Sequence, residues 1–408
     1  MRVLLLHNRY RLAGGEDTVV NAEMALLRSR GQEVRLYEVS NGGIGRSVSP
    51  MQAAARAIYS VGARRDVTRA LAEFAPDVVH VHNFFPLLSP SVHFASRRAG
   101  AAVVQTLHNF RLLCPNGLLF RDGHPCQDCL GRSVPWPSVL HGCYRESHMG
   151  TAAVGAMLTV HRALGTWSRM VDVYIAPSDF VREKFVGAGF APERLVVKPH
   201  FLAGDSVPGD GRGGYALFVG RISEEKGIET LLGAWERLHG LIPLKVVGDG
   251  PLLRAMRATA RALRDCEWLG HRPGEEVRRL MQAASILVVP SRWYETFGMV
   301  IIEAFAAGLP VVAPRHGATA ELVESGRTGL HFTAGDASDL AAAVKWLVSH
   351  PGHLAAMRSR ARAEFEEKYG GDRNYALLMG IYARALEIAR SREAHGAKLR
   401  EEDHPWTP

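Results

Sequence analysis

Residues 290–304 of the chain read PSRWYETFGMVIIEA. An apolar run ends at Pro290, a loop follows, and a helix is predicted to begin near Gly298. Helix N-termini present unpaired N–H groups that bind phosphates, and glycine lets a ligand approach the backbone. Glu295 precedes this helix, whereas Glu303 lies roughly 7–8 Å along its axis. We interpret the stretch as a diphosphate site flanked by hydroxyl-binding carboxylates. The alternative, Glu303 on a solvated helix face, is disfavoured by its apolar neighbours.

Outward from this stretch, short apolar runs alternate with amphipathic helical patterns. Such alternation is typical of parallel sheets covered by helices, which bind ligands at the carboxyl ends of their strands. The predicted strands of this half are Tyr215–Val219, Leu244–Val247, Glu267–Leu269, Ile286–Val289 and Pro310–Ala313.

The N-terminal half repeats the pattern. A glycine-rich break over Phe201–Gly214 separates the halves, and 408 residues exceed what one core of about 250–300 residues holds. We predict an α/β protein with two Rossmann-like doubly wound domains, residues 1–204 and 205–372, facing a central cleft. In residues 373–408, a helix over Tyr375–Arg390 is expected to pack back on the first domain, before a frayed tail. The first domain's predicted strands are Val3–Leu6, Glu33–Tyr37, Asp77–His82, Ala102–Leu107 and Val173–Ala176.

Two cations follow the strand that ends at Val219. Arg221 and Lys226 are predicted at the mouth of the cleft, where a guanidinium fork and an ammonium group neutralise a diphosphate. Taken alone, these residues fit a surface cluster paired with Glu224 and Glu225 better.

Composition narrows the class of protein. Hydrophobic residues make up 47% and charged residues 22% of the chain, as in ordinary globular proteins. No apolar run reaches the roughly 18 residues of a spanning helix, and the N-terminal run is too short for a signal peptide. We therefore expect a cytoplasmic protein.

The net charge of +8 comes from 42 Arg and 7 Lys, and no motif typical of nucleic-acid binding accompanies it. The basic stretch Met51–Phe74 fits either an anionic membrane surface, on the inner face of the cell membrane, or a solvated helix.

Four of the five cysteines lie close together in the sequence. A CxxC pair with flanking cysteines is compatible with a structural zinc site, and disulfides are not expected in a reducing compartment. The alternative is four buried, idle thiols, as we expect for Cys266. The candidate ligands are Cys114, Cys126, Cys129 and Cys143.

Several motifs together resemble the family-4 (group 1) retaining glycosyltransferases of the GT-B type. The resemblance is strong over residues 215–345 and weaker in the N-terminal half. Its motifs are Gly220-Arg221 with Lys226-Gly227, two Glu separated by seven residues, Val247–Pro251, Leu269-Gly270, Pro290-Ser291, Gly308–Ala313, Gly326–Leu330, Gly14–Glu16, Asp77–His82 and Thr106–His108.

The resemblance implies roles for these residues. Arg221 and Lys226 would bind the donor diphosphate, Glu295 the transferred sugar and Glu303 the ribose, while His108 would point at the reacting sugar. Backbone at Leu269 and Gly270 would hold the base. The remaining contacts implied for donor sugar and phosphates come from Gly14, Gly15, Phe297, Gly298 and Met299.

The implied activity is transfer of a sugar from a nucleotide-diphosphate donor to a glycan, lipid-linked or small-molecule acceptor, in cell-surface polysaccharide or glycolipid synthesis. We expect no catalytic metal, because Arg221 and Lys226 supply the positive charge. A nucleotide-sugar epimerase-like enzyme and a non-catalytic sugar-nucleotide binding protein remain the alternatives.

Overall fold

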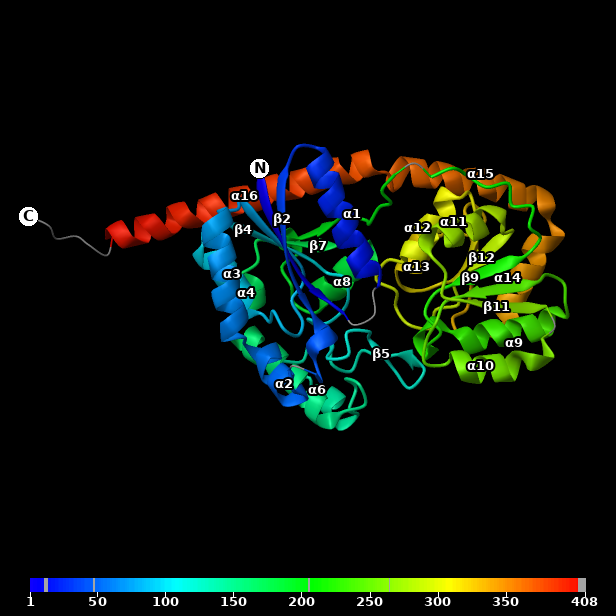
Figure 1. Cartoon of the computed structure of the whole chain (residues 1–408), viewed down its shortest axis with the longest axis horizontal. Helices are drawn as coiled ribbons and strands as arrows, with labels where there is room; N and C mark the ends of the chain where they lie inside the picture. The colour runs from blue at the N-terminus through cyan, green and yellow to red at the C-terminus, as the bar shows by residue number, and fades with distance from the viewer. Residues whose placement is uncertain (11–13, 47, 205, 264, 403–408) are drawn as a thin grey trace, which may run out of the picture.

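The computed structural model describes residues 1–10, 14–46, 48–204, 206–263 and 265–402, with side chains omitted at 262, 393 and 395–402. It contains two six-stranded sheets, each with parallel neighbouring strands (Figure 1). The first follows the order β2 (Glu33–Ser40), β1 (Arg2–Arg9), β3 (Val78–Asn83), β4 (Ala102–Thr106), β7 (Val173–Ala176) and β8 (Leu195–Val197).

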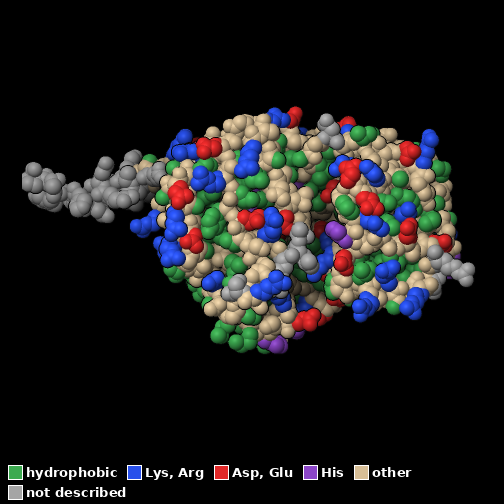
Figure 2. Space-filling view, in the orientation of Figure 1, with side chains coloured by type: hydrophobic (Ala, Val, Ile, Leu, Met, Phe, Trp, Pro, Cys, Tyr) green, Lys and Arg blue, Asp and Glu red, His purple; other side chains and the backbone are tan. Residues whose placement is uncertain are grey.

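The second sheet repeats this plan. Its order is β11 (Cys266–Gly270), β10 (Leu244–Val247), β9 (Ala216–Val219), β12 (Ile286–Val288), β13 (Val311–Pro314) and β14 (Gly329–Phe332). The predicted pair of doubly wound α/β units is thereby confirmed. Between them lies a groove where basic, acidic and histidine side chains gather (Figure 2).

Helices cover both faces of each sheet. Those of the first half are α1 (Gly15–Ser29), α2 (Pro50–Ile58), α3 (Val61–Phe74), α4 (Ser91–Arg98), α5 (Trp136–Leu140), α6 (His148–Ala163), α7 (Thr166–Arg169) and α8 (Asp179–Gly187). Those of the second half are α9 (Ile228–Leu238), α10 (Leu253–Thr259), α11 (Gly274–Ala283), α12 (Met299–Ala306), α13 (Gly317–Leu322), α14 (Ala337–Ser349) and α15 (Pro351–Lys368), and α16 (Gly371–Glu402) ends the helical chain.

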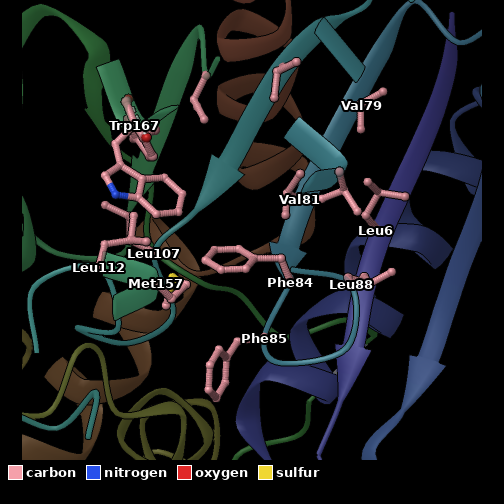
Figure 3. Close-up of a cluster of buried hydrophobic side chains, with 14 of the residues drawn as sticks. Leu6, Val79, Val81, Phe84, Phe85, Leu88, Leu107, Leu112, Met157 and Trp167 are labelled. Atoms are coloured by element: carbon pink, nitrogen blue, oxygen red, sulfur yellow. Dashed lines mark hydrogen bonds between the residues drawn. The ribbon is translucent and has the colours of Figure 1, made fainter. Parts of the chain in front are cut away.

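Alternation along the first strands builds two separate cores. Leu6 of β1 and Val81 of β3 face one side, beside Phe84 and Leu88 of the loop after β3 (Figure 3). Because successive strand side chains point to opposite faces, Val3, Leu5 and Val78 face the other side. There they pack against Leu378, Ile381 and Tyr382 of α16.

The long helix α16 extends from the second unit across the first (Figure 1). It is longer than the predicted Tyr375–Arg390, and the segment expected to fray stays helical to Glu402, whereas 403–408 lie outside the described residues. Ala, Arg, Glu and Lys dominate this extension and are strong helix formers. The predicted basic stretch Met51–Phe74 is instead split into α2 and α3, because the Ser60 hydroxyl caps α3.

A buried ion pair ties α16 to the first sheet. Nζ of Lys198 lies 2.7 Å from Oε1 of Glu23 on α1 and 3.1 Å from Oδ1 of Asn374 on α16. Both charged side chains are fully buried.

Among the described residues, none of the helices combines the length and apolar character needed to span a bilayer.

We expect Lys198→Met to lower the free energy of unfolding by about 3–5 kcal/mol, because it leaves the Glu23 carboxylate buried without a cation. Urea unfolding measures this loss. The double variant Glu23→Leu/Lys198→Met should recover most of it. As a control, Asp372→Ala breaks an exposed pair with Arg30 and should cost at most about 1 kcal/mol. An equal loss of unfolding free energy in Lys198→Met and Asp372→Ala would contradict the assignment of Glu23 and Lys198 as a stabilising buried ion pair.

Candidate functional site

The predicted site residues of the second unit lie at the carboxyl ends of β9, β10, β11 and β12. Backbone contacts make glycine necessary here: a Cβ on Gly227 would lie 1.9 Å from the Pro290 carbonyl oxygen, and one on Gly248 would lie 1.8 Å from that of Gly220. Gly227 also has φ of 71°, which favours glycine. The loops after three neighbouring strands are therefore locked together.

Glu295 and Lys226 meet as an ion pair in this region. Nζ of Lys226 donates to Oε1 of Glu295 at 2.6 Å, and the Ser291 hydroxyl donates to the same oxygen at 2.7 Å. Lys226 also lies 5.2 Å from the ring centre of Trp293, within cation–π range. Burial raises the pKa of Glu295, but attraction and hydrogen bonding by Lys226 outweigh burial and hold it below its usual value. The carboxylate is ionised at neutral pH.

Helix α12 begins beside this pair. Gly298, with φ of 103°, precedes its first residue Met299, and Phe297 is buried beneath the loop. Glu303 lies on the second turn of α12, half-buried, and burial raises its pKa. The predicted arrangement of a helix N-terminus between two glutamates is therefore present.

The remaining residues predicted to bind the donor lie at the edge of the same surface. The backbone N–H of Gly248 donates to the carbonyl of Gly270 at 2.9 Å, which holds Leu269 and Gly270 beside the Gly220 turn. Arg221 is exposed at the start of the loop that carries Lys226. Arg221 lies in the same loop as Lys226. Among the described contacts, none joins Arg221 to Glu295.

Residues of the first unit face this surface across the groove. A Cβ on Gly15 would lie 3.5 Å from Cγ of Met299, so the N-terminus of α1, which Gly14 caps, lies against the start of α12. The Thr296 hydroxyl donates to the carbonyl of His108 at 2.9 Å. His108 and the glycine turn are thus brought to the loop that carries Glu295.

His108 ends a chain of buried polar side chains. Its Nε2 lies 3.0 Å from Nδ1 of His82, and its ring stacks on His200. Nε2 of His82 lies 3.5 Å from Oε2 of Glu23, the partner of Lys198. Burial lowers the pKa of His82 and His108 well below the usual value, and neighbouring histidines lower it further. These imidazoles are neutral at physiological pH.

Glu23, His80 and His82 form the one described group of three ligand atoms close enough for a metal. Two observations disfavour an ion there. Both ring nitrogens of His80 already contact hydroxyls at 2.8 Å, those of Tyr382 and Thr106. The Lys198 ammonium, beside Glu23, would also repel a cation. We interpret this group as a structural ion-pair network.

Glu16 adds an acidic group on the first unit that sequence reasoning did not select. Asn109 donates to one of its oxygens at 2.7 Å and Asn83 to the other at 3.3 Å. Burial raises the pKa of Glu16 to about 7, although the hydrogen bond from Asn109 acts to lower it. Its place beside Gly15 was a usable signal, because Glu16 follows the glycine pair directly.

Sequence reasoning also did not select Arg292 and Ser291 as site residues. Ser291 binds Glu295, and Arg292 lies over Gly227 and 3.8 Å from the carboxylate of Glu229. Both belong to the quoted stretch 290–304, so their proximity to Glu295 was available from the sequence, but the direction of their side chains was not.

The four clustered cysteines come together around one small cavity. Cys114 and Cys129 are buried, whereas Cys126 and Cys143 are partly accessible. Cys266, expected to be buried, is only half-buried in β11.

Two family models match consecutive parts of the chain. The "Glycosyltransferase Family 4" model matches residues 13–202, and the "Glycosyl transferases group 1" model matches residues 208–364. The chain belongs to the group 1/family 4 glycosyltransferases. The first segment covers all strands of the first sheet except β1, and the second covers all strands of the second sheet. The groove therefore lies between the parts of the chain that the two models match.

Curated relatives of this glycosyltransferase family member align with part of its length. A glycogen synthase of Mycobacterium tuberculosis is 32% identical over 247 residues, which are 56% of this chain and 58% of the relative. A GDP-mannose-dependent alpha-mannosyltransferase of Corynebacterium glutamicum is 28% identical over 302 residues, covering 70% of this chain and 63% of the relative. The chain therefore spans about three fifths of these relatives.

Solved structures share the whole fold at lower identity. Anabaena HepE, solved with UDP and glucose, superposes with a TM-score of 0.67 at 19% identity, covering 93% of this chain and 99% of HepE. Sucrose-phosphate synthase of Thermosynechococcus elongatus has a TM-score of 0.68 at 16% identity, covering 97% and 99%. The architecture is the GT-B fold.

The neutral histidines predict a pH-dependent stability. Burial and the Lys198 charge lower the pKa of His80 and His200 to about 3, from 6.5. Below pH 6.5 the unfolded chain binds protons that these folded residues do not. Each residue should therefore lower the free energy of unfolding by about 1.4 kcal/mol for each pH unit of acidification below that value.

Urea unfolding at pH 7 and pH 5 measures the slope. His200→Gln should flatten it by the contribution of one proton, and His124→Gln, at an exposed position, should leave it unchanged. An unaltered slope in His200→Gln would show that His200 is not held neutral.

Proposed function

We propose that the protein transfers a sugar from a nucleotide-diphosphate donor to a glycan or lipid-linked acceptor, with retention of the anomeric configuration. The observation that carries this proposal is the ion pair of Lys226 and Glu295 beside the N-terminus of α12. It supplies a cation, an ionised acceptor of hydroxyl hydrogen bonds and free backbone N–H groups within one surface. A nucleotide-diphosphate sugar needs all three.

The donor would lie along this surface. Arg221 and Lys226 neutralise the diphosphate together with the N–H groups at Gly298 and Met299. Glu295 accepts hydrogen bonds from the sugar, since its ionised carboxylate has no proton to donate. Glu303 accepts the ribose hydroxyls, and backbone at Leu269 and Gly270 receives the base.

Charge stabilisation would then drive the reaction. As the bond from sugar to diphosphate breaks, negative charge grows on the leaving phosphate, where Arg221 and Lys226 stabilise it. The acceptor hydroxyl attacks from the same face, and the leaving phosphate takes its proton. His108, neutral and fixed by His82, positions the sugar ring without placing a second cation beside the developing oxocarbenium charge.

The acceptor would bind on the first unit. Glu16, with its pKa near 7 and its oxygens held by two amides, offers a hydrogen-bond partner for an acceptor hydroxyl opposite Met299. The names of the relatives, a glycogen synthase and a mannosyltransferase, favour a hexose donor.

Substitution of Lys226 tests this assignment. Lys226→Met should lower kcat/KM for transfer by about 10²–10³, because it removes a charge that stabilises the leaving group. Candidate donors are first found by the thermal shift that a bound nucleotide sugar produces. Lys245→Met is the matched control, since Lys245 pairs with Glu267 on β11, away from the ion pair.

Parental turnover by Lys226→Met would contradict the proposal. Donor conversion to an epimer without acceptor would favour the epimerase-like alternative, and donor binding without turnover of any acceptor would favour a binding protein. NMR of the product gives its anomeric configuration, and inversion would exclude the retaining reaction.

We further propose that the end of the first unit formed by α2, α5 and α6 contacts anionic lipid at the inner face of the cell membrane. These helices pack together, and large apolar side chains on and beside them are exposed. Arg56 and Arg65 are exposed nearby. The exposed apolar residues are Met51, Val61, Trp136, Leu140 and Met149.

Flotation with liposomes tests this surface. The protein should float with vesicles that contain phosphatidylglycerol and not with neutral vesicles. Met51→Ser/Trp136→Ser should reduce binding, whereas Trp346→Ser, at an exposed position on α14 of the other unit, should not. Equal flotation of both variants would exclude this face.

A further inference from the structure

The cysteine-bearing segment between β4 and α6 has little regular structure of its own. It contains only the two-stranded antiparallel hairpin of β5 (Phe120–Arg121) and β6 (His124–Pro125), and the short helix α5. Its four cysteines nevertheless line a single cavity of about 10 Å³. This volume is at the lower limit of what holds one water molecule. Neither carboxylates nor histidines are among its lining residues, which also include Asn116, Leu119, Phe120, Arg121 and Ser138.

Hydrogen bonds hold the cysteine-bearing turns together. In the Cys114–Gly117 turn, the N–H of Gly117 donates to the Cys114 carbonyl at 2.9 Å, with φ of 77° at Gly117. The Cys114 thiol donates to Oδ1 of Asn116 at 3.0 Å. The N–H of Cys126 donates to the Leu119 carbonyl at 2.8 Å, which holds the CxxC pair beside the Cys114 turn.

One positive side chain lines the same cavity. Arg121 is held there by Asp128 at 2.9 Å. A divalent ion with four thiolates carries a net charge of −2, which the Arg121 guanidinium group partly offsets.

We propose that Cys114, Cys126, Cys129 and Cys143 bind one Zn²⁺ in a tetrahedral thiolate site. An all-sulfur ligand set favours zinc among the available divalent ions. Four thiols release four protons as the ion binds, and no electron transfer is involved. Among the described residues, no three of these sulfurs lie within 4.8 Å of one another, so binding draws them inward around the ion.

The site would hold the hairpin against the donor surface. Gly123, in the turn between β5 and β6, is buried: a Cβ there would lie 2.8 Å from Nη2 of Arg292 and 3.0 Å from Oε1 of Glu224. Nε2 of Gln127, inside the CxxC sequence, lies 3.4 Å from the Tyr294 hydroxyl. The zinc site therefore fixes a wall of the groove next to the loop that carries Glu295. This inference does not depend on sugar transfer.

Metal analysis of the full chain tests the proposal. Protein purified without chelators should hold one zinc per chain by elemental analysis. Cys126→Ser and Cys129→Ser should lose it, whereas Cys266→Ser, in β11 of the other unit, should keep it. Co²⁺ in place of Zn²⁺ should give the intense thiolate-to-metal absorption and tetrahedral visible bands of a four-sulfur site.

A second measurement on the unmodified chain covers the case in which the serine variants do not fold. Extraction of zinc with a mercurial and a chelator should increase proteolytic cleavage within residues 114–143, and thiol reductant with Zn²⁺ should reverse the increase. Zinc well below one per chain after growth in zinc-supplemented medium would overturn the proposal. Detection of two disulfides among the four cysteines by mass spectrometry would do so too.

Discussion

The ion pair between Lys226 and Glu295 is the interaction on which the surface at the carboxyl ends of β9 and β12 depends. Glu295 is almost fully buried, and a buried carboxylate is stable only with a nearby cation or several donors. Lys226 supplies the cation, and the Ser291 hydroxyl supplies a further hydrogen-bond donor. Because Lys226 follows β9 and Glu295 follows β12, their pairing joins the loops of two adjacent strands, and Gly227 permits it by lying directly on the Pro290 carbonyl. A side chain at Gly227 would separate the partners.

The first unit, in contrast, buries many ionisable groups without a net charge. His80, His82, His108 and His200 are held neutral by burial. The charged groups of this core, Glu23 and Lys198, compensate one another. Neutral imidazole rings lead from this ion pair to His108 at the groove, so the polar interior adds no net charge there. Asn374 connects the same network to α16.

Much of this architecture could be predicted from local patterns. Alternating apolar runs and helices predict both sheets, and the spacing of Glu295 and Glu303 around Gly298 predicts the helix N-terminus between two acids. Pairing of Lys226 with Glu295, 69 positions apart, was not predicted: taken alone, the local sequence favoured Glu224 and Glu225 as partners. The Glu23–Lys198 pair spans 175 positions and has no local signal, because packing of α16 over the sheet creates its burial. The split into α2 and α3 had a signal, the cap at Ser60, which charge patterning obscured.

The two sides of the groove differ in how they are tied to the rest of the chain. The surface at the carboxyl ends of β9 to β12 is built by loops of one sheet, and glycine contacts between their backbones fix its shape. The first unit reaches that surface through polar contacts, such as those of Thr296 with the His108 carbonyl and of Ser178 with the Thr296 carbonyl. Ring contacts of Phe180 with Tyr294 and of His200 with Phe297 also join the units, as does the cysteine hairpin at Gly123. Such mixed contacts are typical of interfaces between units of one chain, which are more polar than a core. The proposed zinc site would therefore give the first unit a fixed wall beside the loop that carries Glu295, independent of the glycine contacts that shape the second unit's surface.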